Sequence, residues 1–286
     1  MIHAAVFLFG FPGLFGKWLP LSPPLIVLGR VVFAGIALAA VLILLRAGFR
    51  ITPSRDIGLL ILCGVVLAAH WTSFFESIQV SSVAVGLLSY SSFPVFTAFL
   101  EPLVLKERLS GRSILLACAC VFGVFLIVPQ FRLADKVFQG VLWGLVSGLT
   151  FSILTIINRT LSRRHSSLII AFYQDTFAAL SLLPFWFLTK PVIDLRTAGL
   201  LLMLGVFCTA GAHTLFIQGM RTVKAQTASI ISSLEPVYGI LLAVVFLKEI
   251  PAMKTIIGGL VILLAAVSAS IGHEAPPAEP EPGRPH

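Results

Sequence analysis

The feature that most constrains this chain is a succession of apolar stretches, each close to the length of a membrane-spanning helix. A bilayer core about 30 Å thick is crossed by about 20 mostly apolar helical residues. Inside lipid, every backbone N–H and C=O group must be paired within the protein, which a helix does by itself. We therefore predict an all-α integral membrane protein whose ten transmembrane helices lie at residues 2–20, 24–45, 57–76, 82–105, 112–129, 138–158, 167–188, 197–219, 225–247 and 253–272.

Composition supports this class and excludes a soluble domain. Hydrophobic residues make up 58% of the chain and charged residues 11%, against about 45–50% and about 25% in soluble domains. The net charge of +8 does not indicate nucleic-acid binding, because the basic residues stand singly between apolar stretches and form no patch. We expect the lipid bilayer as a partner and no nucleic acid.

The cysteines and the termini add little chemistry. Four cysteines lie within apolar stretches and show no spacing typical of a disulfide framework or a metal site, so we expect no metal and no cofactor. No basic segment precedes the first apolar stretch, so a signal peptide is not expected. Residues 273–286 are rich in proline and polar side chains, and we predict that they form a disordered cytoplasmic tail.

Lys and Arg residues in the loops predict the orientation in the membrane. The predicted loops on the side of the N-terminus hold eleven of them, Arg284 in the tail adds a twelfth, and the opposite loops hold six. This bias predicts a multi-pass protein of a bacterial-type plasma (inner) membrane with both termini in the cytoplasm.

The two halves of the chain resemble each other, which predicts domains at 1–130 and 137–272. Pro94, Lys106 and Glu107 are each followed 142 positions later by the same residue type, at Pro236, Lys248 and Glu249. Each half contains five predicted spans, and an odd number turns the second copy over in the membrane. Inverted repeats of this kind are typical of secondary transporters, whose substrate site lies near the midplane between the repeats.

Three segments resemble the EamA-type transporters of the drug/metabolite transporter superfamily: "LFGKWLPLSPPLIVLGRVVFAGIAL" (14–38), "VSSVAVGLLSYSSFPVFTAFLEPLVLKERLS" (80–110) and "VKAQTASIISSLEPVYGILLAVVFLKE" (223–249). The resemblance covers residues 1–272. It implies ten helices in two inverted five-helix repeats, a central cavity, and export of small metabolites such as amino acids. One departure is Phe9-Gly10, where members of the family commonly have Trp-Gly.

Glu235 is the first candidate for a substrate-binding residue. It lies near the middle of its predicted span, Ser232 precedes it on the same helical face, and Pro236 follows it directly. A carboxylate at this depth is costly and tends to face a cavity or a partner. Two interpretations stay open: Glu235 binds a substrate ammonium group or a proton, or it pairs with Arg30 or Lys17.

Further candidates for substrate binding are two histidines and three aromatic residues. His70 and His213 lie at related places in the two halves, where they could titrate near neutral pH or serve as hydrogen-bonded packing residues. Trp71, Tyr90 and Tyr238 could stack on a substrate or pack against lipid and other helices.

Other residues are candidates for structural or coupling roles. Pro94 and Pro236 each remove a helical hydrogen bond inside a predicted span. Arg30 and Asp175 could pair across the bundle. Glu101 shares a helical face with Pro94, although a local salt bridge with Lys106 explains it equally well.

Taken together, these features predict a secondary transporter that moves a small polar, amino-acid-like metabolite by alternating access, in the export direction, and that is not an enzyme. Proton coupling and uncoupled exchange are both open. The alternative is an integral-membrane enzyme acting on a lipid-linked substrate, but the clustered acidic or histidine metal ligands that such chemistry uses are missing from the sequence. A scaffold or receptor would need neither the buried carboxylates nor the repeated prolines.

Overall fold

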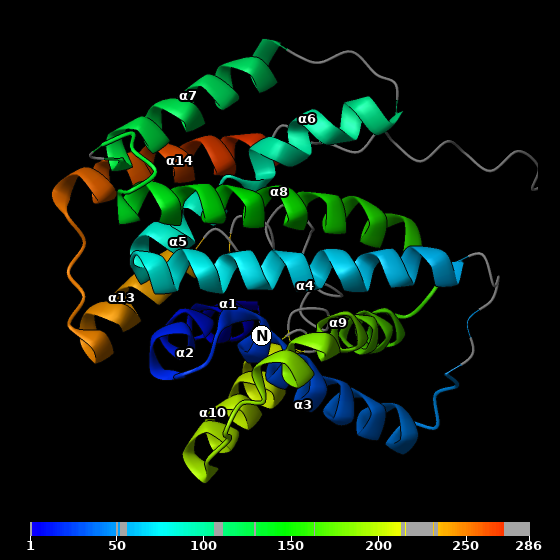
Figure 1. The fold of residues 1–286 in the computed structure, drawn as a ribbon. Coiled ribbons are helices and arrows are strands. Elements are labelled where there is room, and N and C mark those ends of the chain that lie inside the picture. The colour runs from blue at the N-terminus through cyan, green and yellow to red at the C-terminus, as the bar shows by residue number, and fades with distance from the viewer. Residues whose placement is uncertain are drawn as a thin grey trace, which may run out of the picture.

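The computed structural model describes residues 2–49, 51, 56–105, 111–128, 130–162, 164–212, 215, 231 and 234–271. Within these residues the protein is entirely helical, as predicted (Figure 1). His213, Ser232 and the predicted tail at 273–286 lie outside the described residues, as do Lys106 and Glu107.

The helices follow the predicted apolar stretches. They are α1 (Ile2–Gly10), α2 (Pro12–Trp18), α3 (Pro23–Leu44), α4 (Asp56–Val80), α5 (Val83–Tyr90), α6 (Phe93–Leu105), α7 (Gly111–Ile127), α8 (Lys136–Ser162), α9 (Ser167–Thr189), α10 (Leu195–Gly205), the π-helical turn η1 (Val206–Gly211), α13 (Glu235–Leu247) and α14 (Met253–Ile271).

Five helical stretches among the described residues are long and apolar enough to cross a membrane: Pro23–Leu44, Asp56–Val80, Val83–Leu100, Lys136–Ser162 and Ser167–Thr189. Four shorter apolar helices accompany them, at Ile114–Ile127, Leu195–Gly211, Glu235–Leu247 and Met253–Ser268. The protein is therefore a helical membrane protein. The count of ten spans in two inverted repeats stays a prediction.

Two predicted spans are interrupted, contrary to the expectation of continuous helices. The first divides at Phe11, because Pro12 has no N–H to donate to the carbonyl four residues back, although Phe11 itself keeps helical dihedrals (φ −70°, ψ −35°). The fourth divides at Ser91 and Ser92, whose hydroxyls donate to the carbonyls of Leu87 (2.7 Å) and Ser89 (2.6 Å) and so satisfy the end of α5.

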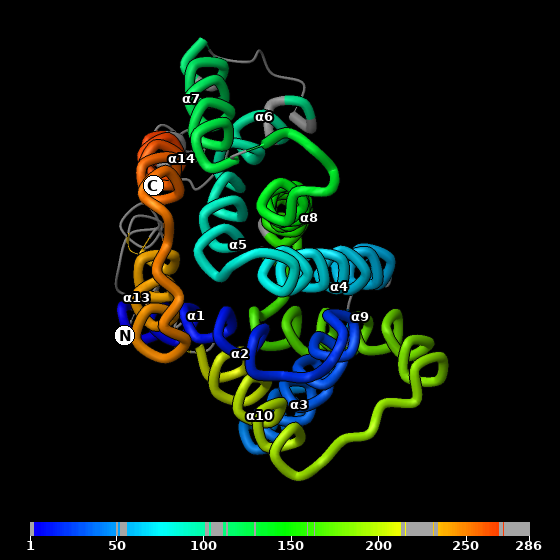
Figure 2. Tube along the Cα trace, turned by 60° about the vertical axis from the view of Figure 1, so that its left-hand side comes forward, coloured from blue at the N-terminus to red at the C-terminus, as the bar shows by residue number. Residues whose placement is uncertain are grey.

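The pair α4 and α8 forms the middle of the bundle. Helices α6, α7 and α14 lie on one side of this pair and α3, α9 and α10 on the other (Figures 1 and 2). The two helices are antiparallel, since Ser77 near the end of α4 donates to the carbonyl of Gly140 near the start of α8 (2.5 Å), while Asp56 contacts Arg164 at the opposite end.

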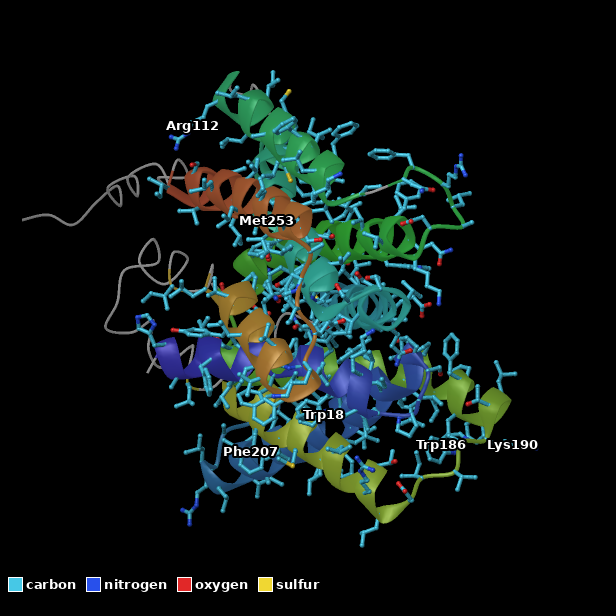
Figure 3. All side chains as sticks on the ribbon, turned by 90° about the vertical axis from the view of Figure 1, so that its left-hand side faces the viewer. Trp18, Arg112, Trp186, Lys190, Phe207 and Met253 are labelled. Carbon is cyan, nitrogen blue, oxygen red and sulfur yellow. The ribbon has the colours of Figure 1, made fainter. Side chains whose placement is uncertain are left out.

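The outward surface of the bundle is rich in large apolar side chains. Met253 is 68% exposed, Phe207 59% and Trp186 41%, and Figure 3 shows these residues among side chains that surround the helices. A water-soluble protein exposes such patches sparingly, whereas the lipid-facing surface of a membrane protein requires them. This surface fits the membrane assignment.

Two glycines mark places where helices cross in close contact. A Cβ on Gly64 of α4 would lie 2.4 Å from the Cβ of Phe177 and 2.9 Å from the nitrogen of Ala178, both on α9. A Cβ on Gly205 of α10 would lie 2.7 Å from the Cβ of Phe33 and 3.1 Å from the nitrogen of Ala34, both on α3. The α4–α9 and α10–α3 crossings share these two contacts, and at Gly205 the Arg30 carbonyl oxygen lies closer still, at 2.6 Å.

Candidate functional site

A small pocket lies where the break between α5 and α6 faces the start of α13. Its free interior is about 10 Å³, room for about one water molecule, and it is lined by Tyr90, Ser91, Phe93, Pro94, Glu235, Pro236, Leu263 and Ala266. The structure therefore brings together both prolines of the sequence repeat, the glutamate beside one of them and one of the predicted aromatic residues.

Each proline lies in the first turn of a helix. Phe93 begins α6 and Glu235 begins α13, so Pro94 and Pro236 each occupy the second helical position. There the missing N–H of proline has no intrahelical acceptor to lose. The sequence predicted that each proline removes a helical hydrogen bond inside its span; in the structure each one lies at the start of a new helix.

Glu235 is half-buried at the N-terminus of α13, beside the pocket. The free backbone N–H groups of a helix N-terminus stabilise a negative charge, which helps to explain how a carboxylate is tolerated at this place. Glu235 also interacts electrostatically with Arg30 of α3. A proton or an ammonium group held by Glu235 would therefore compete with Arg30 for the carboxylate.

Tyr238 does not line the pocket. Its ring packs edge-on against Phe7 of α1, with centroids 5.7 Å apart, and its hydroxyl lies 3.5 Å from Nδ1 of His3. This placement fits helix packing better than contact with a substrate.

Arg30 is the most buried cation that the structure describes in the bundle, with 3% of its surface exposed. Its Nε donates to the hydroxyl of Thr209 (2.7 Å), and its Cζ lies 3.8 Å from the ring centroid of Trp71. The Thr209 hydroxyl itself donates to the Leu204 carbonyl (2.9 Å), which leaves an oxygen lone pair for Arg30. Arg30 is thus fixed by one hydrogen bond and one cation–π contact.

Asp175 is buried on α9, with 3% of its surface exposed, and attracts Arg30 electrostatically. Among the described residues, neither Asp175 nor Glu235 forms an ion pair with Arg30. The predicted cross-bundle relationship between Arg30 and Asp175 is therefore one of proximity without direct contact.

His70 is buried in a group of aromatic rings. Its Nδ1 lies 3.0 Å from the carbonyl oxygen and 2.9 Å from the hydroxyl of Ser147. The ring lies 4.9 Å from Phe151 and 5.4 Å from Tyr90, centroid to centroid. These contacts support the packing interpretation of His70. Trp71 and Tyr90 belong to the same group and connect Arg30 with the pocket.

Several residues of the site had no sequence signal. Thr209 depends on a π-helical turn, and no spacing in the sequence predicts one. Leu263 and Ala266 reach the pocket from α14, which contains none of the candidate residues.

Of the remaining candidates, Glu101 lies on α6, but its side chain is outside what the structure describes. The described residues contain no cluster of three or more His, Cys, Asp or Glu that could hold a metal.

Comparisons with known proteins agree on one family. The EamA-like transporter family matches residues 1–128 and again residues 138–271. An uncharacterized transporter of Archaeoglobus fulgidus is 29% identical over 69% of this chain and 70% of its own. The pseudopaline exporter CntI of Pseudomonas aeruginosa is 28% identical over 84% of this chain and 85% of its own.

More distant relatives extend the similarity. Human solute carrier family 35 member G1 is 24% identical over 85% of this chain and 70% of its own. A crystal structure at 18% identity superposes with a TM-score of 0.63, over 94% of this chain and 95% of the other, which shows similarity of fold alone. The matched family and these named relatives are transporters and not enzymes. Because the family match spans nearly the whole chain, this protein belongs to the EamA-like transporter family.

Proposed function

We propose that the protein is a secondary transporter that exports a small polar, amino-acid-like metabolite across a bacterial-type inner membrane by alternating access. The observation that carries the proposal is the pocket between the two proline-marked helix starts, with Glu235 at its side. Irregular backbone at membrane depth is tolerated where it is buried in protein or lines a cavity. Discontinuous helices of this kind commonly surround the substrate of secondary transporters.

The proposal includes ten spans in two inverted repeats, and the packing supports this architecture. Suppose that each span of the first half corresponds to the span five places later. The contact between α4 (third span) and α9 (seventh span) then corresponds to the contact between α10 (eighth span) and α3 (second span). The contacts of α8 with α5 and α6 then correspond to those of α13 with α1 and α2. Gly64 lies at the α4–α9 crossing and Gly205 at the α10–α3 crossing, and the contacts that they share support the same correspondence.

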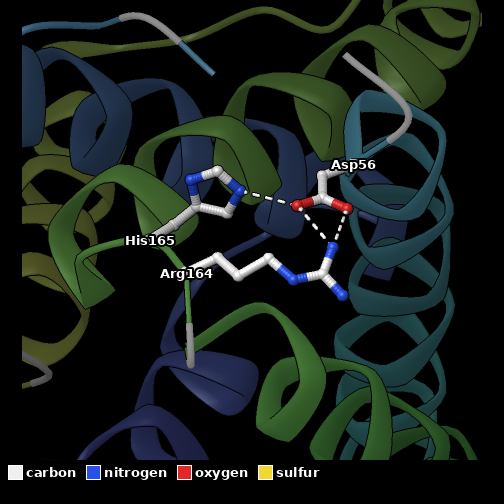
Figure 4. A network of polar contacts seen from close by, with 3 residues as sticks. All are labelled: Asp56, Arg164 and His165. Atoms are coloured by element: carbon white, nitrogen blue, oxygen red, sulfur yellow. Dashed lines mark hydrogen bonds and ion pairs between the residues drawn. The ribbon is translucent and has the colours of Figure 1, made fainter. Parts of the chain in front are cut away.

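The direction and the orientation rest on separate arguments. Export is favoured by the similarity to the pseudopaline exporter CntI. Both termini in the cytoplasm are favoured by the excess of basic residues in the loops on that side. In this orientation Asp56, Arg164 and His165 meet at the cytoplasmic end, where they tie the start of α4 to the α8–α9 connection (Figure 4).

Within this mechanism Glu235 binds the positively charged group of the substrate, or a proton that exchanges with it. Among the described residues of the pocket lining, Glu235 contributes the carboxylate, and its side chain is half-buried. The aromatic group formed by His70, Trp71, Tyr90, Phe93 and Phe151 provides an apolar wall next to this charge.

The test is uptake of a labelled mixture of L-amino acids into proteoliposomes by wild type and Glu235→Gln, between about pH 5.5 and 8. We expect the variant to lose at least about tenfold in rate, because a neutral amide cannot replace a charge in a dry site. Glu76→Gln is the matched control, since Glu76 is also half-buried in a span but lies outside the pocket lining. Wild-type rates in Glu235→Gln across this pH range would refute the role of Glu235.

A further inference from the structure

We propose that Arg30 binds the carboxylate of the transported metabolite and selects substrates that have one. This inference rests on the proposed transport function and adds the second half of its substrate site: Glu235 for the positive group and Arg30 for the negative group.

The first argument is the unused donor capacity of Arg30. A guanidinium group donates from all three of its nitrogens. In the structure Nε donates to Thr209, and the two terminal nitrogens donate to no described residue. Trp71 covers one face of the guanidinium and fixes its plane. What remains is the edge with two parallel N–H groups, which is the edge that binds a carboxylate in a bidentate manner.

The second argument is the balance of charge. A buried cation is strongly destabilising unless it is neutralised nearby. Asp175 and Glu235 both attract Arg30, yet neither forms an ion pair with it in the described residues. Arg30 therefore lies near two carboxyl groups without contacting either, and its own contact edge is free for an incoming carboxylate. A fully paired arginine would offer no such site.

The third argument is the position of Arg30 relative to the pocket. Arg30 interacts electrostatically with Glu235, which lines the pocket. It also stacks on Trp71, a neighbour of the ring of His70, and His70 in turn packs against Tyr90 of the pocket lining, with ring centroids 5.4 Å apart. A zwitterion between the two charged groups would pair with both at once. The chemical class is therefore an amino acid or a derivative that keeps a free carboxylate, rather than an amine, a sugar or a neutral drug.

A purely structural role is the competing explanation, in which Arg30 only compensates Asp175 and Glu235. The two explanations differ in what they predict for ligands. A structural arginine affects all ligands equally, whereas a carboxylate-binding arginine affects acids and leaves the corresponding amides unchanged.

The test measures thermal stabilisation of the detergent-purified protein by each of the L-amino acids and by the matching L-amino acid amides, at saturating concentration. For the wild type we expect at least one amino acid to bind about 100-fold more tightly than its amide, because a site built for a carboxylate rejects a ligand that lacks it. In Arg30→Gln we expect the amino acid to bind no more than about fivefold more tightly than its amide. In Arg30→Lys we expect the ratio to fall about tenfold, because lysine keeps the charge but lacks the two parallel N–H groups.

Two further variants keep the test decisive. Thr209→Val keeps the charge and removes the anchor of Nε, and it is expected to lower the acid-to-amide ratio about tenfold. Arg112→Gln is the control: Arg112 is exposed at the start of α7, donates to the Ser268 carbonyl near the end of α14 and does not line the pocket, so the ratio should not change. If Arg30→Gln does not fold, Thr209→Val alone decides.

Three outcomes overturn the proposal: no amino acid stabilises the wild type, amides stabilise it as well as acids, or the ratio survives in Arg30→Gln or in a folded Thr209→Val. Transport by the wild type together with an unchanged acid-to-amide ratio in Arg30→Gln rejects the role of Arg30 and leaves the proposed function intact. Loss of transport in Glu235→Gln is measured independently, so the two proposals fail separately.

Discussion

The carboxylate of Glu249 accepts a hydrogen bond from the backbone N–H of Val83, at 3.0 Å. The two residues are far apart in the sequence, yet Glu249 follows α13 and Val83 begins α5, so one helix end caps another. Next to them, Lys17 at the end of α2 donates to the carbonyl of Ser81 (3.0 Å). Glu249 and Lys17 together thus connect the ends of α13 and α2 with the start of α5, at the end of the bundle that we predict to face outward.

Replacing Glu249 should loosen the start of α5. A carboxylate at a helix N-terminus contributes about 1 kcal/mol, so Glu249→Ala should raise the hydrogen-exchange rate of the amides at 83–86 about fivefold. Exchange followed by mass spectrometry resolves this segment. Glu76→Ala serves as the control, and equal exchange in the two variants would show that the contact has no stabilising effect.

The contact of Arg30 with Trp71 should be measurable in stability. Trp71→Leu removes a cation–π contact that is desolvated, and we expect a loss of about 2 kcal/mol or more, with a lower apparent Tm in detergent. Trp143→Leu is the control because Trp143 is 43% exposed on the lipid-facing side of α8. If both variants melt together, Trp71 does not hold Arg30 in place.

Gly64 and Gly205 should tolerate no side chain. Alanine at either position places a Cβ within 3 Å of the neighbouring helix, which costs about 1–3 kcal/mol through displaced backbone. Gly58 on α4 and Gly199 on α10 have open space around them, so alanine there should be neutral or slightly stabilising. Thermal denaturation of the four variants compares each glycine with a control on its own helix. A parallel loss at Gly64 and Gly205 would also support their equivalence in the repeat.

Asp56 should be important for stability at the end of the bundle that we predict to be cytoplasmic. Its carboxylate is nearly inaccessible and contacts Nη1 of Arg164 at 2.8 and 3.2 Å and Nε2 of His165 at 2.9 Å. Asp56→Ala leaves both partners without their acceptor, and we expect the apparent Tm to fall by several degrees. Arg132→Ala, an exposed loop residue, provides the reference; a comparable Tm for the two variants contradicts the prediction.

Asp194 should make a pH-dependent contribution at the start of α10. Its carboxylate accepts a hydrogen bond from the Thr197 N–H (2.8 Å), and hydrogen bonding from Thr197 holds the pKa of Asp194 below its ordinary value of 3.8. A lowered pKa stabilises the folded state above the ordinary pKa, and this contribution is lost as the pH falls through the folded-state value. The stability difference between wild type and Asp194→Ala should therefore be constant near neutral pH and shrink below about pH 4. A constant difference at all pH values argues against this cap.

Hydrophobicity and local chemistry predicted much of the architecture. A membrane-spanning helix needs a stretch of about 20 mostly apolar residues, whatever it packs against. The positions of these stretches could therefore be found without any knowledge of packing. The prolines and Glu235 were identified for the same reason: each is unfavourable in a continuous apolar helix. That the chain is a transporter followed from the repeat and the family resemblance, and the family match confirms it.

The sequence by itself determined the membrane class, the places of the helices and the short list of costly residues. Only the tertiary structure decided which of them meet: Pro94 with Pro236 at one pocket, Arg30 on Trp71 and Thr209, and Tyr238 turned toward α1. The physical reason is that any face of an apolar helix can pack against lipid or protein at similar free energy. The partner of a buried polar group is therefore set by contacts between residues far apart in the chain, such as the close crossings at Gly64 and Gly205.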